Sequence, residues 1–216
     1  MNWYFYFSKI NVEVLSGLTM RLCEYIKADI YRFFEYEYSG KHEVSLFQII
    51  STIIRHEELK PLIWYRIGRW IVVNVKKSYI RKPLIFFWST INYLLILMSR
   101  NICIHLGADI GKGLYLHHGP IWIGPTKIGE YCNFSMMDLI GFGGRDENFG
   151  IPVIGDRVFL GPGAILTGKI KIGSNVAVGA NAVVTKDVPD NCTVGGIPAR
   201  ILNKKGSDCL IEIRKV

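Results

Sequence analysis

The chain has 216 residues, of which 50% are hydrophobic and 20% charged. This balance excludes an intrinsically disordered chain and predicts a globular protein with one fold of ordinary size or two small ones. The net charge of +8 is uneven, because residues 1–100 carry 14 Lys and Arg against 8 Asp and Glu, and residues 101–216 carry 12 against 10. A basic, aromatic first part fits an anionic lipid surface or a solvated face over a core equally well, and no nucleic-acid module accompanies the charge.

The amino-terminal stretch MNWYFYFSKINVEV has no basic segment before an apolar core and no small-residue cleavage site, so it does not resemble a signal peptide. The cysteines are odd in number and form no CxxC pair, which favours reduced thiols. We therefore expect a cytoplasmic protein. The cysteines are Cys23, Cys103, Cys132, Cys192 and Cys209.

Residues 1–100 contain two prolines and few glycines, and apolar residues recur at helical spacing, as in FQIISTIIRHEELKPLIWYRIGRWIVV. This pattern predicts several helices. The most apolar stretch runs from Pro83 to Met98 and is flanked by Arg81, Lys82 and Arg100. Its sixteen residues fall short of the roughly 20 that span a bilayer. We expect a buried or interfacial helix there, with the inner face of the cytoplasmic membrane as a candidate surface.

From residue 101 onward, aliphatic residues recur every six positions, and glycine follows many of them. Such a period is the signature of a parallel β-helix, in which three short strands close one triangular coil and the aliphatic residues stack inside. The spacing alone does not fix the handedness. The thirteen positions expected to point inward are Ile104, Ile110, Leu116, Trp122, Ile128, Phe134, Ile140, Ile154, Leu160, Leu166, Ile172, Val178 and Val184.

The repeat is interrupted once, by GFGGRDENFGIPV from Gly141 to Val153. This segment is rich in glycine and charge, and we expect it to leave the coil as a loop. Loops on rigid scaffolds often carry function, although a surface insertion without a role is the other interpretation.

Two adjacent histidines, His117 and His118, follow the inward Leu116. They are expected at a corner of the coil, facing outward. A neutral imidazole there suits proton removal from a hydroxyl near neutral pH, and solvated surface or a metal site are the alternatives. Stacked positions lie about eighteen residues apart, whereas His105 and His118 are thirteen apart, so one chain lacks a zinc ligand set. No metal is therefore expected.

The segments ADIGKGLYLHHGPIWIG, IPVIGDRVFLGPGAILTGKIKIGSNVAVGANAVVTKDVP and GGIPARI resemble the hexapeptide-repeat acyltransferases of the serine O-acetyltransferase-like branch, and more narrowly its polysaccharide-biosynthesis members. The resemblance implies an α+β chain with a helical domain at 1–100, a left-handed β-helix at 101–202 and a tail at 203–216. It also implies a homotrimer or a dimer of trimers, with acetyl-CoA as co-substrate between neighbouring prisms.

The same resemblance assigns roles to individual residues. His118 takes the place of the family's general base, which removes a proton from the acceptor hydroxyl as it attacks the thioester. Small residues let the pantetheine arm run along the backbone, and basic residues meet its phosphates. The positions that match the family's coenzyme contacts are Gly143, Gly161, Gly163, Ala164, Ala180, Lys186, Pro198, Ala199, Arg200 and Lys205.

Two departures from the family pattern shape our expectation of the reaction. The family's base-supporting aspartate is Cys103 here, so Asp138 becomes the candidate partner of His118, unless it is a structural aspartate. The family's serine-contacting aspartate and histidine are His117 and Ile151, which suggests that the amino-acid site is lost.

We therefore expect O-acetylation of a sugar hydroxyl in a surface polysaccharide or its precursor. Serine O-acetylation for cysteine synthesis is the first alternative, and a non-catalytic scaffold the second. The expected acceptor contacts are His117, Phe142, Arg145, Asp146, Glu147 and Ile151.

Overall fold

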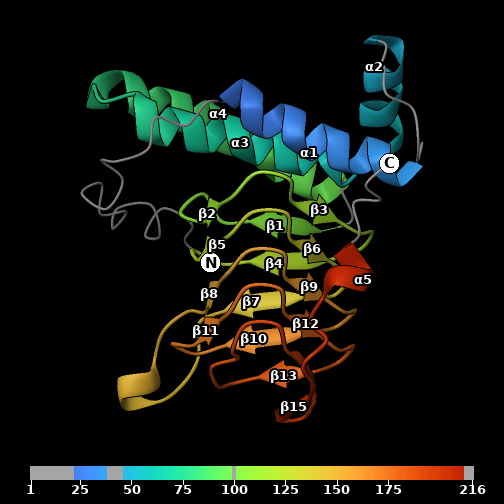
Figure 1. Cartoon of the computed structure of the whole chain (residues 1–216). Coiled ribbons are helices and arrows are strands. Elements are labelled where there is room, and N and C mark those ends of the chain that lie inside the picture. Colours follow the sequence, from blue (N-terminus) through green and yellow to red (C-terminus); the bar gives the residue numbers. More distant parts are fainter. Residues whose placement is uncertain (1–21, 38–45, 99–100, 212–216) are drawn as a thin grey trace.

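A computed structural model describes residues 22–37, 46–98 and 101–211. Helices lie across one end of a prism built from parallel strands, as Figure 1 shows. The expected helical part and β-helix are thus both present. The helices before the prism are α1 (Leu22–Glu37), α2 (Leu46–Arg55), α3 (Leu59–Asn74) and α4 (Ser78–Met98).

Helices α3 and α4 form an antiparallel pair held by two tryptophans. The indole of Trp64 donates to the Trp88 carbonyl at 3.1 Å, and Trp88 donates back to the Trp64 carbonyl at 2.8 Å. Gly68 is required at this crossing, because a Cβ there would come within 2.3 Å of the Trp88 ring. Among the described residues, no helix has the length and apolar character needed to cross a membrane.

The prism has three faces, each a ladder of short parallel strands, and the chain visits them in turn. Sheet A pairs β1, β4, β7, β10 and β13, sheet B pairs β2, β5, β8 and β11, and sheet C pairs β3, β6, β9, β12 and β14. The arrangement is a parallel β-helix of about five turns, consistent with the left-handed hexapeptide-repeat form. The strands are β1 (Ile102–Ile104), β2 (Asp109–Ile110), β3 (Tyr115–Leu116), β4 (Ile121–Ile123), β5 (Lys127–Ile128), β6 (Asn133–Phe134), β7 (Leu139–Gly141), β8 (Val153–Ile154), β9 (Phe159–Leu160), β10 (Ile165–Thr167), β11 (Lys171–Ile172), β12 (Ala177–Val178), β13 (Val183–Val184), β14 (Thr193–Gly196) and β15 (Ala199–Asn203).

Twelve of the thirteen residues that the six-residue period predicts to point inward lie inside the prism, and the prediction is wrong for Trp122. The Trp122 side chain points outward and is 45% exposed, whereas Ile123 is fully buried and aligns with Ile104 and Ile140. Ile123 follows Leu116 by seven positions and not six, so the connection between β3 and β4 is one residue longer than the repeat. The extra residue falls in the His117–Pro120 turn, which gives the two histidines room outside the coil.

The core continues from the prism into the helices without a break. Phe33 of α1 and Tyr65 of α3 are buried in the same apolar cluster as Tyr115 and Leu116 of the first coil. The rings of Phe33 and Tyr115 lie 4.5 Å apart between centroids. The first coil is therefore fixed against the helices along its sheet C side.

At the other end of the prism, β15 folds back antiparallel on β14, and the short helix α5 (Asp208–Ile211) follows. Asp208 accepts from Arg157 at 2.8 Å and from Asn175 at 3.0 Å. This segment is tied to the corner between sheets B and C.

Candidate functional site

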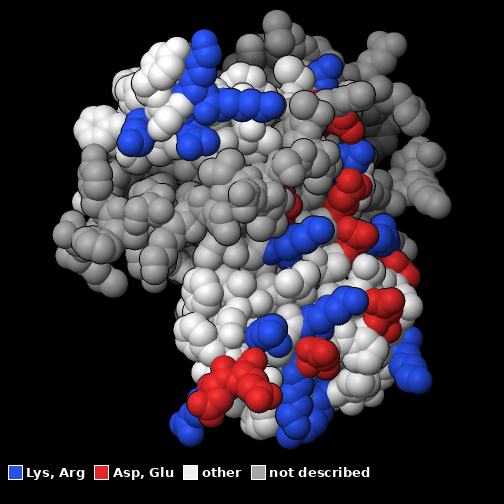
Figure 2. Space-filling view, turned by 90° about the vertical axis from the view of Figure 1, so that its left-hand side faces the viewer, with Lys and Arg blue, Asp and Glu red and all other residues white. Residues whose placement is uncertain are grey.

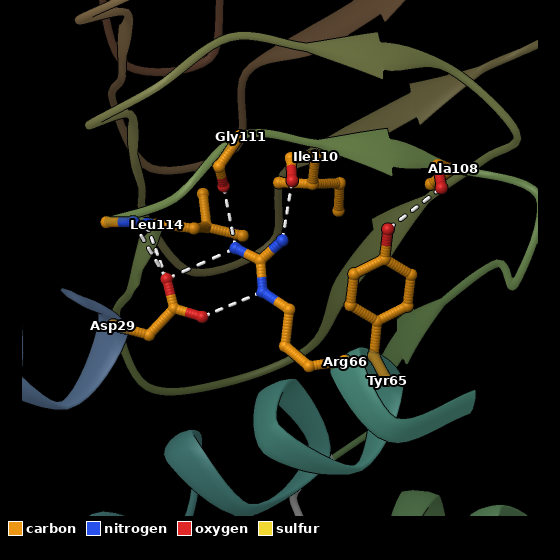
Figure 3. Close-up of polar contacts among 8 residues, drawn as sticks. Asp29, Tyr65, Arg66, Ala108, Ile110, Gly111 and Leu114 are labelled. Atoms are coloured by element: carbon orange, nitrogen blue, oxygen red, sulfur yellow. Dashed lines mark hydrogen bonds and ion pairs between the residues drawn. The ribbon is translucent and has the colours of Figure 1, made fainter. Parts of the chain in front are cut away.

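A buried ion pair joins the helices to the turn that leads into the two histidines (Figure 3). Arg66 of α3 and Asp29 of α1 are both fully buried, and Nε of Arg66 lies 2.8 Å from Oδ2 of Asp29. The guanidinium also donates to the carbonyls of Ile110 and Gly111 at 2.5 and 2.6 Å.

The Asp29 carboxylate also binds the main chain of the first coil directly. Its Oδ1 accepts the main-chain N–H groups of Gly113 and Leu114 at 2.8 and 3.1 Å. Burial raises the pKa of the Asp29 carboxyl, while Arg66 and the two N–H groups act to lower it. Because β3 follows Leu114 directly, this pair fixes the backbone three residues before His117.

The carboxylate nearest to His118 belongs to Glu58, at the start of α3. Nδ1 of His118 lies 3.2 Å from Oε1 of Glu58, whose side chain is 4% exposed, whereas the His118 side chain is 65% exposed. Nδ1 of His56 lies 3.3 Å from the same oxygen. The buried Glu58 carboxylate thus contacts two imidazoles. The His118 side chain is exposed, whereas the His56 side chain is only 16% exposed.

This arrangement leaves one nitrogen of His118 available for chemistry. A carboxylate can only accept hydrogen bonds, so a neutral His118 that donates from Nδ1 to Glu58 keeps the lone pair on Nε2. The imidazole is oriented by Glu58, and its positive charge is stabilised when Nε2 takes a proton. The pair has the parts of a general base with a supporting carboxylate.

His117 has a different environment. Its ring packs edge-on against Tyr115, with centroids 4.8 Å apart. Burial lowers the pKa of His117, the neighbouring His118 lowers it further, and Glu58 acts in the opposite direction. His117 is therefore held neutral beside the more exposed imidazole.

The expected partnership of Asp138 with His118 is corrected by the structure. Asp138 is 2% exposed, and its two oxygens accept the main-chain N–H groups of Ser135 at 2.8 Å and Ala164 at 3.0 Å. Burial raises the pKa of Asp138 to about 8 against the opposing effect of these N–H groups. Asp138 joins successive turns of the prism, and Glu58 occupies the place that we expected it to fill.

Sequence reasoning missed Glu58 because it lies 60 positions before His118, outside the repeat. One signal was available: Glu57 and Glu58 are the last acidic residues before Asp109.

The turns between sheets C and A stack below His118, and we name them the histidine corner: residues 117–120, 135–138, 161–164 and 179–182. Gly163 has a φ of +76°, and its N–H donates to the Met136 carbonyl, while Asn181 donates to Pro162. Gly196–Pro198 continue this stack, because Val194 pairs with Val178. The expected coenzyme residues found here are Gly161, Gly163, Ala180 and Pro198, and Ala199 and Arg200 follow at the start of β15.

Two further expected coenzyme residues, Ala164 and Lys205, have different surroundings. Ala164 is fully buried, and its N–H is bonded to Asp138 and to the Gly161 carbonyl. Lys205 precedes Gly206, and the neighbouring Ser207 bonds to Asn175 at the corner between sheets B and C. Both assignments stay predictions.

The interrupting loop leaves from a different corner, between sheets A and B, which we name the loop corner: residues 105–108, 124–126, 142–152, 168–170 and 185–187. Gly143 and Gly150 exchange main-chain hydrogen bonds of 3.0 and 2.9 Å and close the loop. Phe142 and Phe149 stack with centroids 6.1 Å apart and are 50% and 62% exposed. Figure 1 shows the loop projecting from the opposite side of the prism to β3.

The expected site is thus divided between two corners of one chain. His117 and His118 lie on the histidine corner, whereas Phe142, Gly143, Ile151 and Lys186 lie on the loop corner. The expected loop contacts Arg145, Asp146 and Glu147 are all exposed there. No single corner of the prism therefore carries both sets.

No group of three or more metal-ligating side chains occurs among the residues that the structure describes. The imidazoles of His56 and His118 both contact Oε1 of Glu58. The site as described offers acid–base chemistry.

Comparison with known proteins places the chain near the serine acetyltransferases. Residues 151–186 match the family model of the bacterial transferase hexapeptide (six repeats). The serine acetyltransferase of Synechococcus elongatus is 32% identical over 159 residues, which make up 73% of this chain and 62% of that protein. The chain therefore spans less than two thirds of that relative.

Two solved structures share the fold. The serine acetyltransferase of Neisseria gonorrhoeae in complex with serine is 25% identical, with a TM-score of 0.66 over 88% of this chain and 73% of that one. The Brucella abortus serine acetyltransferase in complex with coenzyme A is 22% identical, with a TM-score of 0.64 over 85% and 68%. The second likeness concerns the fold alone.

These findings overturn our expectation of a sugar acceptor. The similar curated protein and the solved structure at 25% identity are both serine acetyltransferases, and the latter holds serine. The expectation rested on His117 and Ile151 at two aligned positions, which is too little to exclude an amino acid when other side chains can bind its charges.

Proposed function

We propose that the chain is an acetyl-CoA-dependent O-acetyltransferase that transfers the acetyl group to the hydroxyl of serine, with His118 as general base. The observation that carries this proposal is the Glu58–His118 pair at 3.2 Å, placed above a corner of small residues. The similarity to serine acetyltransferases supports the acceptor. Residues 101–202 form the transferase domain in this proposal, residues 1–100 the helical domain that supplies Glu58, and residues 203–216 the tail.

The reaction runs in one ternary complex. Nε2 of His118 takes the proton from the serine hydroxyl as the oxygen attacks the thioester carbonyl of acetyl-CoA. The C–S bond then breaks, the thiolate of CoA leaves, and the proton on His118 returns to that sulfur. Glu58 stabilises the imidazolium between these two steps, and His56 holds Glu58 in place.

The coenzyme fits the histidine corner by the size of its side chains. Gly163 and Ala180 leave the main chain open along the outside of the stack, which suits a pantetheine arm running below His118. Arg200 is exposed at the lower end, where a guanidinium can pair with phosphate. Gly143 and Lys186 come from the loop corner of the neighbouring chain.

The acceptor is a zwitterion, so its site must pair an ammonium and a carboxylate. The exposed loop segment carries both signs of charge: Arg145 suits the carboxylate, and Asp146 with Glu147 suits the ammonium. This assignment replaces the two family positions occupied by His117 and Ile151. His117 stays beside the acceptor as a neutral imidazole.

A trimer brings the two corners together. The outward residues of sheet A form an apolar stripe in register, with Trp122 paired to Cys103 and Leu139, and Leu139 to Ile165. Sheet B instead carries Asp109, Lys127 and Lys171 outward. We propose that sheet A faces the threefold axis, which sets the histidine corner of one chain against the loop corner of the next.

The first test measures CoA release with a thiol reagent during turnover of serine. We expect His118→Ala to lose at least about a hundredfold in kcat while CoA still binds, because positioned general-base catalysis is worth about 10² to 10⁴. His117→Ala is the matched control and should lose far less. Absence of serine turnover in the wild-type chain, or an active His118→Ala, would refute the proposal.

The second test mixes inactive chains. His118→Ala and Arg145→Ala are each expected to be nearly inactive alone. After the two are unfolded together and refolded, mixed trimers should regain part of the activity, because some interfaces then combine an intact His118 with an intact Arg145. No recovery, with light scattering showing mixed trimers, would mean that both residues serve one chain.

A further inference from the structure

The outward face of α4 is apolar and aromatic along its length. Five exposed apolar residues share this face, one at the start of the helix and two adjacent pairs that follow seven to eight and fourteen to fifteen positions later. Trp88, on the opposite side of the helix, is buried against α3, so the outer face is not needed for that packing. The five are Tyr79 (72% exposed), Phe86 (63%), Phe87 (64%), Tyr93 (60%) and Leu94 (54%).

The end of the α3–α4 hairpin carries the basic side chains. Lys76, Lys77 and Lys82 are exposed, and Arg81 is half-buried. No acidic residue occurs anywhere between Glu58 and Asp109, so these cations lack acidic neighbours in sequence. Figure 2 looks onto this side of the molecule and shows Lys and Arg gathered at its top without Asp or Glu among them.

We infer that the α4 face binds the surface of an anionic lipid bilayer, with the helix lying in the plane of the interface. Phe86, Phe87 and Leu94 would enter the boundary between headgroups and acyl chains, the tyrosines would remain at headgroup level, and the basic end would meet lipid phosphates. The absence of acidic residues over fifty positions favours this occupant, because an acid on the face would be repelled by the same phosphates. The helix lies on the bilayer and does not cross it.

This inference stands apart from the choice of acceptor. The α4 face belongs to the helical part at the far end of the prism from β13 and β15 (Figure 1). His118 and the loop lie on corners of the prism, so lipid binding through α4 leaves both open to substrates. Binding to lipid and turnover of serine can therefore be measured separately on the same preparation.

The test is flotation of the full chain with vesicles of phosphatidylcholine and phosphatidylglycerol in a 7:3 ratio, against vesicles of phosphatidylcholine alone. We expect at least about tenfold more binding to the anionic vesicles in 0.05 M NaCl, and a loss of most of this preference in 0.5 M NaCl, where screening acts over only a few ångströms. Equal binding to both vesicle types, or no binding to either, would overturn the inference.

Two variants assign the binding to α4. Lys76→Glu/Lys77→Glu and Phe86→Ser/Phe87→Ser should each reduce binding at least about tenfold, without change in serine turnover in solution. The matched control Lys127→Glu/Lys171→Glu makes the same change of charge on sheet B and should bind as the wild type does. If light scattering instead shows that Phe86→Ser/Phe87→Ser yields a smaller oligomer, the face is covered by a second copy and the inference fails.

Discussion

Glu58→Gln tests the central feature of the site, the carboxylate behind His118. Glutamine keeps the size of the side chain and an oxygen that can accept from Nδ1, but it removes the negative charge that stabilises the imidazolium. Both side chains would otherwise stay in place, since Glu58 is 3% exposed and immediately precedes α3 as its N-cap. The variant therefore isolates the electrostatic contribution of the pair.

The size of the effect follows from the contact. A hydrogen bond to a charged group contributes about 1.5–3 kcal/mol, and water reaching the His118 ring, which is 65% exposed, weakens the interaction toward the lower part of that range. Each 1.36 kcal/mol changes a rate tenfold. We expect kcat for Glu58→Gln to fall by roughly 10- to 100-fold, with little change in CoA affinity.

The assay is steady-state CoA release with serine, with far-UV circular dichroism as the check on folding. Glu57→Gln is the matched control, because Glu57 is adjacent in sequence but exposed. The double variant Glu58→Gln/His118→Ala should be no slower than His118→Ala alone, since the carboxylate acts through the imidazole. Additive losses in the double variant, or a kcat for Glu58→Gln within twofold of wild type, would refute the reasoning.

Two further predictions concern stability. Asp29→Ala leaves the fully buried Arg66 without its partner. We therefore expect denaturant titrations to show a loss of about 3–5 kcal/mol in the free energy of unfolding, and Arg66→Met in the same chain should recover part of it. A loss under about 1 kcal/mol would contradict this prediction. Asp138 binds a proton in the folded chain up to about pH 8 but is ionised above about pH 4 when unfolded. Stability should therefore fall as the pH rises from about 4 to 8 and then level off, and Asp138→Asn should remove this slope; parallel curves for both proteins would show that the N–H groups of Ser135 and Ala164 keep the carboxylate ionised.

Much of the fold could be predicted from the sequence because the constraint is local and repeated. Each coil must bury one aliphatic residue per side, so a period of six appears in the sequence itself, and twelve of thirteen inward positions follow from it. The exception is Trp122, which follows the one turn where the spacing between inward residues departs from six. One extra residue in the His117–Pro120 turn shifts β4 by one position, and in a strand a shift of one exchanges the inner and outer faces.

The parallel coil, the loop that interrupts it and the outward histidine pair could all be predicted from the sequence, because they depend on spacing within a few residues. Tertiary structure alone decided which carboxylate serves His118, since Glu58 belongs to another part of the chain and carries no periodic mark. The tertiary structure also shows that both oxygens of Asp138 accept main-chain N–H groups. It further shows that the loop and the histidines lie on different corners of the prism. These contacts depend on how the three sheets close around one core and on how the helices pack against it. Such packing brings together residues that are far apart in the sequence.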